Sequence, residues 1–367
     1  MRVDQVLPGF NRGDAMSNAA RFLRRQLAAR GFATAIYAEH IQPRARDEAI
    51  DVEHFFAAPP PDLTIYHYGI GTPVTARLRR RPEPKLMIYH NVTPAHYFVG
   101  VNEELARLCR LGRTDLVADR RRYDAVFAVS EYNRRELLRL GYEQVDLWPL
   151  PIDWSDYDRE PDAAVLRTLE RLGGPHLLFV GRISVNKRQD DVIRAYAAFR
   201  RLFAPTAHLW LVGTAVGQES YLEALRRLAQ ALGVADGTHF IGHASFPELL
   251  GYYHGAHLFL SMSEHEGLGI PLLEAMYFGV PVVAHAAAAV PETVADAGLL
   301  FTEKRFDAVA ALLDRVLSDR ALRDQLVAAG RRRVLDFAPE RCMARFDALL
   351  AERFPRLFDG ATAAPAR

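Results

Sequence analysis

Two glutamates eight residues apart are the residues whose type and spacing best suit chemistry in this chain. Glu266 and Glu274 lie in the stretch SMSEHEGLGIPLLEAM, residues 261–276. An apolar run leads into this stretch and glycines follow, which predicts a strand, a loop and a helix that begins near Ile270. Free N–H groups and the positive end of the helix dipole would make that helix start favourable for an anion.

The loop between the glutamates can bring the backbone close to a ligand. Gly267, Leu268 and Gly269 precede Pro271, whose missing N–H is harmless at the start of a helix. We expect Glu274 in the first helical turn, where a carboxylate can accept hydrogen bonds from two vicinal hydroxyls of a ribose or hexose. The combination predicts a sugar nucleotide as the ligand. The alternative is that Glu274 merely complements the helix dipole.

Two cations follow another apolar run, at residues 176–180. Arg182 and Lys187 come directly after it, where fixed cations could neutralise a diphosphate. Three of the 46 basic residues are lysine, at positions 85, 187 and 304, so the chain uses arginine wherever any cation will do. A lysine at 187 therefore favours a specific role, although a pair of solvated surface cations is the alternative.

Two further candidates lie nearer the N-terminus. His90 closes the apolar run KLMIYH, a position where a lone histidine is more often structural than catalytic. Gly13 stands between the first expected strand and the first expected helix, where backbone amides could approach a phosphate or an acceptor.

These residues must be positioned by the elements around them. Short runs rich in Val, Ile, Leu, Phe and Tyr alternate with amphipathic segments, which predicts parallel sheets covered by helices. We read two such series and expect two doubly wound α/β domains, whose ligands bind at the carboxyl ends of the strands. The expected strands are 3–8, 33–40, 62–69, 85–91, 125–130 and 145–151 in the first series, and 176–182, 207–213, 239–243, 258–263, 280–284 and 298–301 in the second.

Prolines and aspartates in PLPIDWSDYDREPD break both periodicities and mark a domain junction. We therefore expect an N-terminal domain over 1–152 and a linker over 153–165. A C-terminal domain follows over 166–340, and a helix over 341–367, with a frayed end, packs back toward the N-terminal domain. The triplet Asp156-Tyr157-Asp158 within the linker has the D-x-D form of some metal-dependent transferases, but no strand precedes it, so we expect it to be solvated.

Composition excludes several classes of protein. With 367 residues, the chain can build two cores. A net charge of +1 is too balanced for binding nucleic acid by bulk electrostatics. Two distant cysteines, Cys109 and Cys342, can form neither a disulfide framework nor a four-thiolate zinc site, which fits a reducing cytoplasm. The sequence begins without a secretory signal pattern, and no run approaches the roughly 20 apolar residues of a membrane span.

The segment EHEGLGIPLLEA resembles the E-x7-E motif of retaining glycosyltransferases of the GT-B fold, in the GT4 family (glycosyl transferase group 1). FVGRISVNKRQD resembles the same family's strand, glycine, arginine and downstream lysine, and VPVVAHAAAAVPETVADAGLLF extends the match over nearly all of the second domain. The first domain matches more loosely, through IYHNVTPAHYF and a first loop with one glycine where many relatives have two.

The resemblance implies two Rossmann-like domains that face each other across a cleft, the N-terminal one for the acceptor and the C-terminal one for the nucleotide-sugar donor. It implies transfer of a hexose, such as mannose, from a nucleoside diphosphate sugar to a saccharide or lipid-linked acceptor in polysaccharide or glycoconjugate synthesis. Retention of anomeric configuration, no cofactor and no obligatory metal are expected. Catalytic contacts are implied for His90 and Glu266, and donor contacts for Arg182, Lys187, Gly267, Leu268, Gly269, Glu274 and Gly13.

Other functions stay open. A sugar-nucleotide epimerase can share this fold and donor site, and so can a non-catalytic sugar-nucleotide-binding subunit. Basic clusters at 77–81 and 120–122 lie in the first 150 residues, whose 22 basic and 18 acidic residues leave a charge of +4. Such runs are usually solvated helix faces. Peripheral contact with an anionic membrane at its inner face is the alternative.

Overall fold

The structure is a computed structural model that describes residues 1–358. It divides into two compact units, which we describe separately. Unit 1 comprises Met1–Ala95, Glu104–Asp153 and the chain from Phe337, and unit 2 comprises His96–Glu103 and Trp154–Asp336. The stretch that the sequence analysis assigned to a linker, 153–165, holds a 3-10 turn and the start of a helix that belong to unit 2, apart from Asp153.

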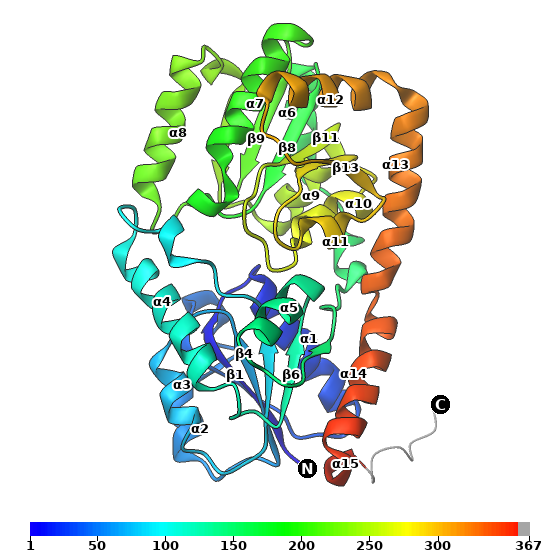
Figure 1. The fold of residues 1–367 in the computed structure, drawn as a ribbon. Coiled ribbons are helices and arrows are strands. Elements are labelled where there is room, and N and C mark those ends of the chain that lie inside the picture. The colour runs from blue at the N-terminus through cyan, green and yellow to red at the C-terminus, as the bar shows by residue number, and fades with distance from the viewer. Residues whose placement is uncertain (359–367) are drawn as a thin grey trace. The chain divides into compact units, whose positions relative to one another are not determined.

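Unit 1 contains one parallel sheet with the strand order β3-β2-β1-β4-β5-β6-β7. Strands β1, β4 and β6 of this sheet are labelled in Figure 1. All six strands predicted for this part of the chain are present. β3 was not predicted, because two residues are too few to show an alternating pattern. The strands are β1 (Val3–Phe10), β2 (Ile36–Ile41), β3 (Ile50–Asp51), β4 (Leu63–Tyr68), β5 (Lys85–Tyr89), β6 (Ala125–Ala128) and β7 (Asp146–Leu147).

Local signals set the ends of the first helix in unit 1. The side chain of Asp14 accepts a hydrogen bond from the Ser17 amide and begins α1, and Gly31, with φ 84°, follows its end as predicted. Near the C-terminus, the indole of Trp148 donates to the Cys342 carbonyl at 3.0 Å and anchors α14 within unit 1. The helices are α1 (Ala15–Ala29), α2 (Val52–Ala57), α3 (Pro73–Leu78), α4 (Glu103–Ala118), α5 (Glu131–Arg139), α14 (Pro339–Arg353) and α15 (Pro355–Phe358).

Unit 2 repeats this architecture with its own parallel sheet, in the order β10-β9-β8-β11-β12-β13. Numbered from its first strand, this is the order 3-2-1-4-5-6 of dinucleotide-binding α/β domains, in which ligands bind where the order reverses. That point lies between β8 and β11. The strands are β8 (His176–Val180), β9 (His208–Val212), β10 (Thr238–Gly242), β11 (Leu258–Ser261), β12 (Val282–His285) and β13 (Gly298–Phe301). The predicted α/β fold of two doubly wound sheets is confirmed.

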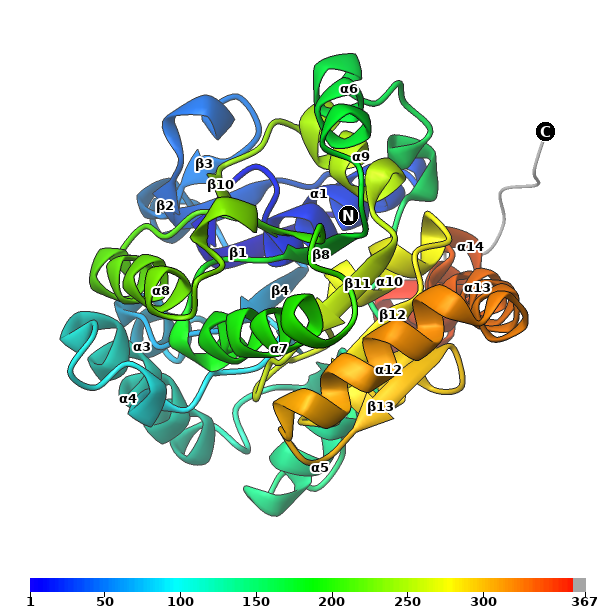
Figure 2. The same cartoon turned by 90° about the horizontal axis from the view of Figure 1, so that it is seen from above.

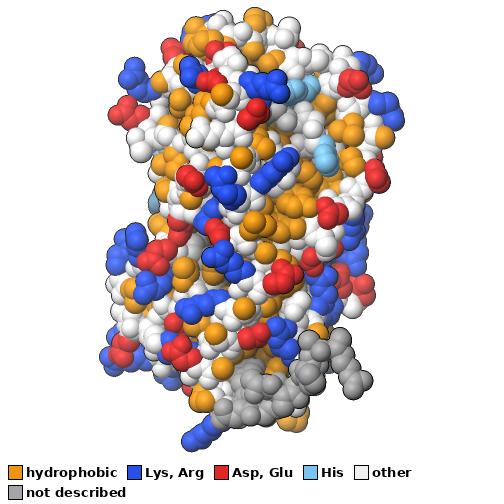
Figure 3. All heavy atoms as spheres, turned by 90° about the vertical axis from the view of Figure 1, so that its right-hand side faces the viewer, with side chains coloured by type: hydrophobic (Ala, Val, Ile, Leu, Met, Phe, Trp, Pro, Cys, Tyr) orange, Lys and Arg blue, Asp and Glu red, His pale blue; other side chains and the backbone are white. Residues whose placement is uncertain are grey.

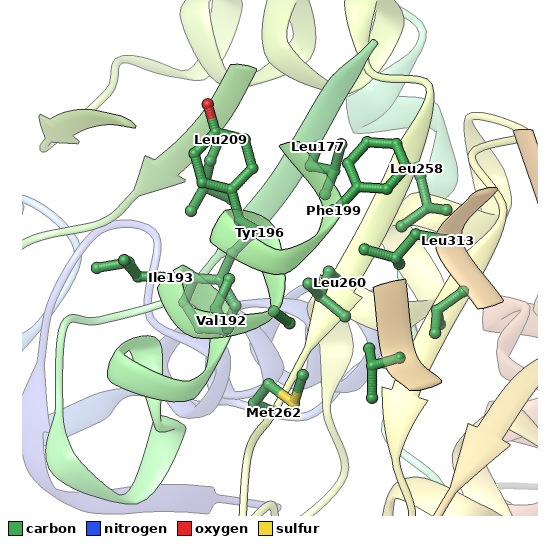
Figure 4. Packing of buried hydrophobic residues seen from close by; sticks show 14 of the residues in the cluster. Leu177, Val192, Ile193, Tyr196, Phe199, Leu209, Leu258, Leu260, Met262 and Leu313 are labelled. Carbon is green, nitrogen blue, oxygen red and sulfur yellow. The ribbon is translucent and has the colours of Figure 1, made fainter. Parts of the chain in front are cut away.

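Helices α7 and α12 lie side by side over one face of the unit 2 sheet (Figure 2). Tyr196 and Phe199 of α7 and Leu313 of α12 pack with Leu209 and Leu260 of the strands, and all are buried (Figure 4). This core fixes the strand ends that carry the site loops. The helices of unit 2 are α6 (Ala163–Leu172), α7 (Gln189–Leu202), α8 (Glu219–Ala231), α9 (Phe246–Gly255), α10 (Ile270–Tyr277), α11 (Val290–Val294), α12 (Phe306–Ser318) and α13 (Arg320–Arg333).

Basic and acidic side chains are interspersed on the face drawn in Figure 3. Arginines of the predicted basic clusters are largely paired: Arg79 bonds to Asp119 at 2.6 Å, and Arg81 bonds to Glu83 at 3.1 Å. Pairing weakens the positive field that an anionic surface would meet. Among residues 1–358, no helix combines the length and the apolar character needed to cross a bilayer.

Candidate functional site

Two of the predicted site residues of unit 2, Lys187 and Glu266, meet where the strand order reverses. Arg182 and Lys187 lie on the loop from β8 to α7, and Glu266 lies on the loop after β11. The ammonium group of Lys187 donates to Oε2 of Glu266 at 2.5 Å, and both side chains are mostly buried. The structure therefore brings together one predicted cation and one predicted carboxylate, from loops that follow neighbouring strands.

A buried asparagine joins the same two loops. The Glu264 amide donates to the Asn186 carbonyl at 2.9 Å, and Nδ2 of Asn186 donates to the His265 carbonyl at 3.2 Å. Ser184 in turn donates to Oδ1 of Asn186 at 2.7 Å. The loops are thus held in register immediately beside Lys187 and Glu266. Asn186 could not be identified from the sequence, because its role depends on a partner 79 residues away.

A second buried amide fixes the loop that carries Arg182. Nε2 of Gln189 donates to the Arg182 carbonyl at 2.9 Å, and its Oε1 accepts from the Ser184 amide at 3.3 Å. The Arg182 side chain is exposed and makes no hydrogen bond to any other described residue. The guanidinium of Arg182 is therefore available for an anion, while its backbone is held in place by the hydrogen bond from Gln189.

An ionic cluster borders the Lys187–Glu266 pair. Arg188 bonds to Asp191 at 3.1 Å and to Glu264 at 3.3 Å, and Lys304 bonds to the same two carboxylates at 2.8 and 2.7 Å. Two cations thus compensate the acidic side chains of this edge. Lys187 is paired with Glu266 alone, and Arg182 has no carboxylate partner among the described residues, so it is the cation best placed to meet a further anion.

Helix α10 begins at Ile270, as predicted. Gly269 precedes it with φ 89°, a left-handed conformation that favours glycine, and Pro271 is the second helical residue. A Cβ on Gly269 would lie 2.9 Å from the Leu272 side chain. Glu274 is the fifth residue of α10 and lies in its second turn. The prediction that Glu274 lies in the first turn is wrong, and the alternative that it merely complements the helix dipole loses its support, because that effect fades beyond the first turn.

Glu274 is buried and held by two tyrosines. Tyr157 donates to Oε1 and Tyr253 donates to Oε2, both at 2.6 Å. Burial raises the pKa of Glu274, and the two hydrogen bonds oppose that rise. Each carboxylate oxygen keeps a second acceptor position for a ligand hydroxyl.

The linker triplet does not behave as the sequence suggested. Tyr157 was expected to be solvated together with Asp156 and Asp158, and that prediction is wrong for Tyr157, whose hydroxyl reaches Glu274. Its neighbour Asp158 accepts from Tyr277 at 2.6 Å. The sequence could not predict this, because a tyrosine between two aspartates can be either exposed or buried, and the residues around it do not distinguish the two cases.

The remaining loop residues contribute their backbone. The Leu268 side chain is buried, and its carbonyl accepts a hydrogen bond from the Thr293 hydroxyl. The Glu266 carbonyl accepts from the Ala289 amide at 3.3 Å. Gly267 lies between them and is partly exposed. The loop after β11 is therefore tied to the start of α11.

His90 lies in unit 1, directly after β5. Its Nε2 lies 2.9 Å from Nδ1 of His67, and Nε2 of His67 lies 2.9 Å from Oε1 of Gln5. Burial lowers the pKa of His90 to about 3, so the ring is neutral near pH 7. His90 was predicted as a site residue, whereas His67 and Gln5, which lie on the neighbouring strands β4 and β1, were not.

A polar network holds the residue after His90. Asn91 adopts φ 92°, and its Nδ2 donates to Asn133 at 2.8 Å and to Glu136 at 3.2 Å. The Tyr89 hydroxyl donates to the same Glu136 at 2.6 Å, and Arg113 pairs with it at 2.9 Å. The backbone at the end of β5 is therefore fixed on both sides of His90.

Gly13 lies on the exposed loop between β1 and α1 of unit 1, with φ 82°. A Cβ there would meet open space, so the conformation and not crowding favours glycine. Among residues 1–358, no group of three or more His, Cys, Asp or Glu side chains is arranged to hold a metal ion.

The similarity to a known protein family lies within unit 2. Residues 167–333, most of unit 2, match the family described as glycosyl transferases group 1. The two-unit fold is similar to sucrose-phosphate synthase from Thermosynechococcus elongatus, with a TM-score of 0.76 at 21% identity over 97% of this chain and 100% of that one. The family match therefore covers most of unit 2, and the two doubly wound sheets have the GT-B fold.

Two curated relatives make the comparison more specific. A GDP-mannose-dependent alpha-(1-6)-phosphatidylinositol monomannoside mannosyltransferase of Mycobacterium tuberculosis is 34% identical over 221 residues, 57% of this chain and 56% of the relative. A D-inositol 3-phosphate glycosyltransferase of Salinispora arenicola is 30% identical over 277 residues, 72% of this chain and 57% of the relative. The chain therefore spans little more than half the length of the curated relatives it matches.

Proposed function

We propose that this chain transfers a hexose, with mannose favoured, from a nucleoside diphosphate sugar to a hydroxyl of a saccharide or lipid-linked acceptor. The observation that carries the proposal is the Lys187–Glu266 contact at the point where the unit 2 strand order reverses. A cation and a carboxylate lie together at the carboxyl edge of the sheet. The cation suits the diphosphate of the donor, and the carboxylate suits its polyhydroxylated sugar. The similarity to a relative named as GDP-mannose-dependent favours GDP-mannose as the donor.

In this account the cations act on the leaving group. Negative charge develops on the departing diphosphate while the sugar becomes oxocarbenium-like, so fixed positive groups lower the barrier most. Arg182 and Lys187 supply them, together with the amides at the start of α10. Because Gln189 and Asn186 fix the loops beforehand, little reorganisation is needed when the charge appears.

The carboxylates bind the neutral parts of the donor. Glu266 accepts hydrogen bonds from sugar hydroxyls, and Glu274, held by two tyrosines, accepts from the ribose. His90 contacts the transferred sugar. We further propose retention of configuration and no obligatory metal. The leaving phosphate oxygen takes the acceptor proton on the face where the new bond forms, so no enzymic nucleophile is required.

Product analysis tests the proposal. The full chain is incubated in EDTA with radiolabelled GDP-mannose or UDP-glucose and either a saccharide mixture or a phosphatidylinositol-containing lipid extract. Label that moves to an acceptor with the α configuration retained supports the proposal. A new sugar nucleotide formed from the donor alone would indicate an epimerase instead. Binding without turnover in every mixture would indicate a non-catalytic subunit.

A further inference from the structure

A chain of three side chains inside unit 1 ends at His90. Gln5 of β1 contacts His67 at the end of β4, and His67 contacts His90 after β5, with both contacts at 2.9 Å. The amide nitrogen of Gln5 also donates to the Ala20 carbonyl of α1 at 3.0 Å. Because β1, β4 and β5 are neighbours in the sheet, the chain crosses three adjacent strands.

The Ala20 carbonyl sets the direction of every hydrogen in this chain. A carbonyl oxygen only accepts, so it must face the amide NH2 of Gln5, and the amide oxygen then faces His67. Nε2 of His67 must therefore carry a hydrogen. A neutral imidazole has one N–H, so Nδ1 of His67 accepts and Nε2 of His90 donates. Nδ1 of His90 is left as an acceptor.

Burial keeps the imidazole rings of His67 and His90 neutral. Gln5 and His67 are fully buried, and His90 is partly buried. Burial lowers the pKa of His67 and of His90, and a charge on His90 would further disfavour one on His67. Among the described residues no carboxylate bonds to either ring, so nothing offsets this preference. Nδ1 of His90 likewise makes no hydrogen bond to the described residues.

We propose that Gln5 and His67 are positioning residues that hold His90 as its Nε2–H tautomer, so that Nδ1 accepts a hydrogen bond from a hydroxyl of the transferred sugar. The inference rests on the proposed function for the identity of that hydroxyl. An acceptor at Nδ1 suits a hydroxyl and is repelled by a phosphate oxygen. The tautomer therefore assigns His90 to the sugar and not to the diphosphate of the donor.

Nitrogen-15 NMR of the histidine-labelled full chain reads the tautomer without turnover. The His90 signals are those lost in His90→Gln, and we expect a protonated Nε2 and an unprotonated Nδ1 in the wild type. Gln5→Leu removes the acceptor that orients His67, so the His90 ring should become a mixture of tautomers. A wild-type His90 protonated at Nδ1, or a ring unchanged in Gln5→Leu, contradicts the proposal. The wild-type spectrum decides the tautomer even where a variant does not fold.

Kinetics separate positioning from a structural role. His67→Phe should lower kcat/KM for the donor about tenfold, the size of one hydrogen bond. A donor analogue that lacks the hydroxyl bound by His90 should have a lower kcat/KM than the full donor with the wild type. His67→Phe should lower kcat/KM for this analogue little further. Tyr66→Phe is the matched control, because it removes another buried hydrogen bond of β4, to Thr75 at 2.8 Å. It should lower the melting temperature and leave kcat/KM unchanged.

The outcomes distinguish this inference from the proposed function. Transfer that is sensitive to His90→Ala but not to His67→Phe would overturn the positioning role while the function stands. Transfer that is insensitive to His90→Ala would remove His90 from the sugar site. If no donor is turned over at all, the function fails, and the NMR result still decides whether Gln5 and His67 fix the tautomer.

Discussion

Lys187 and Glu266 lie 2.5 Å apart, although 79 residues separate them in the sequence. Each follows a strand at the point where the unit 2 sheet order reverses, and each neutralises the other in the unliganded chain. A donor that places its diphosphate on Lys187 and its sugar hydroxyls near Glu266 would replace one contact by several. The pair therefore holds both side chains in place before the donor arrives.

Lys187→Met should lower donor affinity and rate together, because the charge acts on the diphosphate in both the ground state and the transition state. Hydrogen bonds to charged groups are worth roughly 1.5–3 kcal/mol, so kcat/KM should fall about tenfold to a hundredfold. Steady-state kinetics with a varied donor measure this. Unchanged kinetics would remove Lys187 from the site.

Lys85→Met provides a matched control for that variant. Lys85 is also mostly buried, and its ammonium donates to the carbonyls of Arg81 and Glu83 at 2.6 and 2.8 Å in unit 1. Its loss should lower the melting temperature and leave the Michaelis constant for the donor unchanged. A kinetic loss equal to that of Lys187→Met would mean that neither lysine acts specifically.

Tyr157→Phe should weaken donor binding through Glu274. Burial raises the pKa of Glu274 and the Tyr157 hydroxyl lowers it, so removing that hydroxyl raises the pKa further. The variant should show a Michaelis constant for the donor about threefold to tenfold higher. As the pH is lowered, this constant should begin to rise at a higher pH in the variant than in the wild type, because Glu274 is protonated earlier. Donor kinetics from pH 5 to 8 test this. Tyr277→Phe, which loses a bond to Asp158, should keep the wild-type profile.

Glu274→Gln should mainly raise the Michaelis constant for the donor. The amide keeps the shape of the side chain but loses half of the acceptor capacity that a ribose diol needs. We expect an increase of about tenfold with kcat less affected. A truncated donor that lacks the ribose 2-hydroxyl should bind the wild type and the variant alike. An unaffected constant for the full donor would return Glu274 to a structural role.

Histidine burial in unit 2 predicts loss of stability at acid pH. Burial lowers the pKa of His176 to about 4, and its ring accepts from Trp210 and bonds to the Leu169 carbonyl. The pKa of His176 in the folded chain lies below its unfolded value of about 6.5. Its contribution to the free energy of unfolding is therefore fully present above pH 6.5 and is lost as the pH falls toward 4. The loss approaches about 1.4 kcal/mol per pH unit. Urea unfolding at pH 4.5 to 7.5 measures it.

The comparison that isolates this histidine uses two variants. His176→Gln should flatten the fall in unfolding free energy between pH 6.5 and 4.5 relative to the wild type. His243 is exposed, so His243→Gln should leave the fall unchanged. Parallel curves for the wild type and His176→Gln would show that His176 does not titrate in this range.

The sheet could be predicted because parallel strands buried on both faces read as continuous apolar runs. All twelve expected strands are present, from β1 to β13, and β3 escaped because a pair of residues carries no period. The helix start at Ile270 followed from glycine and proline chemistry, which acts locally. The placement of Glu274 failed by one turn, since proline occupies the second helical position and not the first.

Contacts between distant residues could not be predicted in the same way. Asn186, Tyr157 and His67 are ordinary polar residues in the sequence, and each acquires its role from a partner on another strand, helix or loop. Lysine was the exception. Lysine is rare in this arginine-rich chain, and that rarity singled out Lys187. All three lysines make specific hydrogen bonds: Lys187 to Glu266, Lys85 to two carbonyls and Lys304 to two carboxylates.

Thermal unfolding of the purified chain with a panel of nucleoside diphosphates and their sugars, in EDTA, tests the donor site most directly. A ligand that binds the folded state alone stabilises it by about 2.7 kcal/mol at a hundredfold excess over its dissociation constant. We predict a rise in melting temperature selective for one base, with GDP-mannose favoured, and its loss in Arg182→Ala/Lys187→Ala. No rise with any nucleotide from a folded sample, or an equal rise in the double variant, would contradict the account.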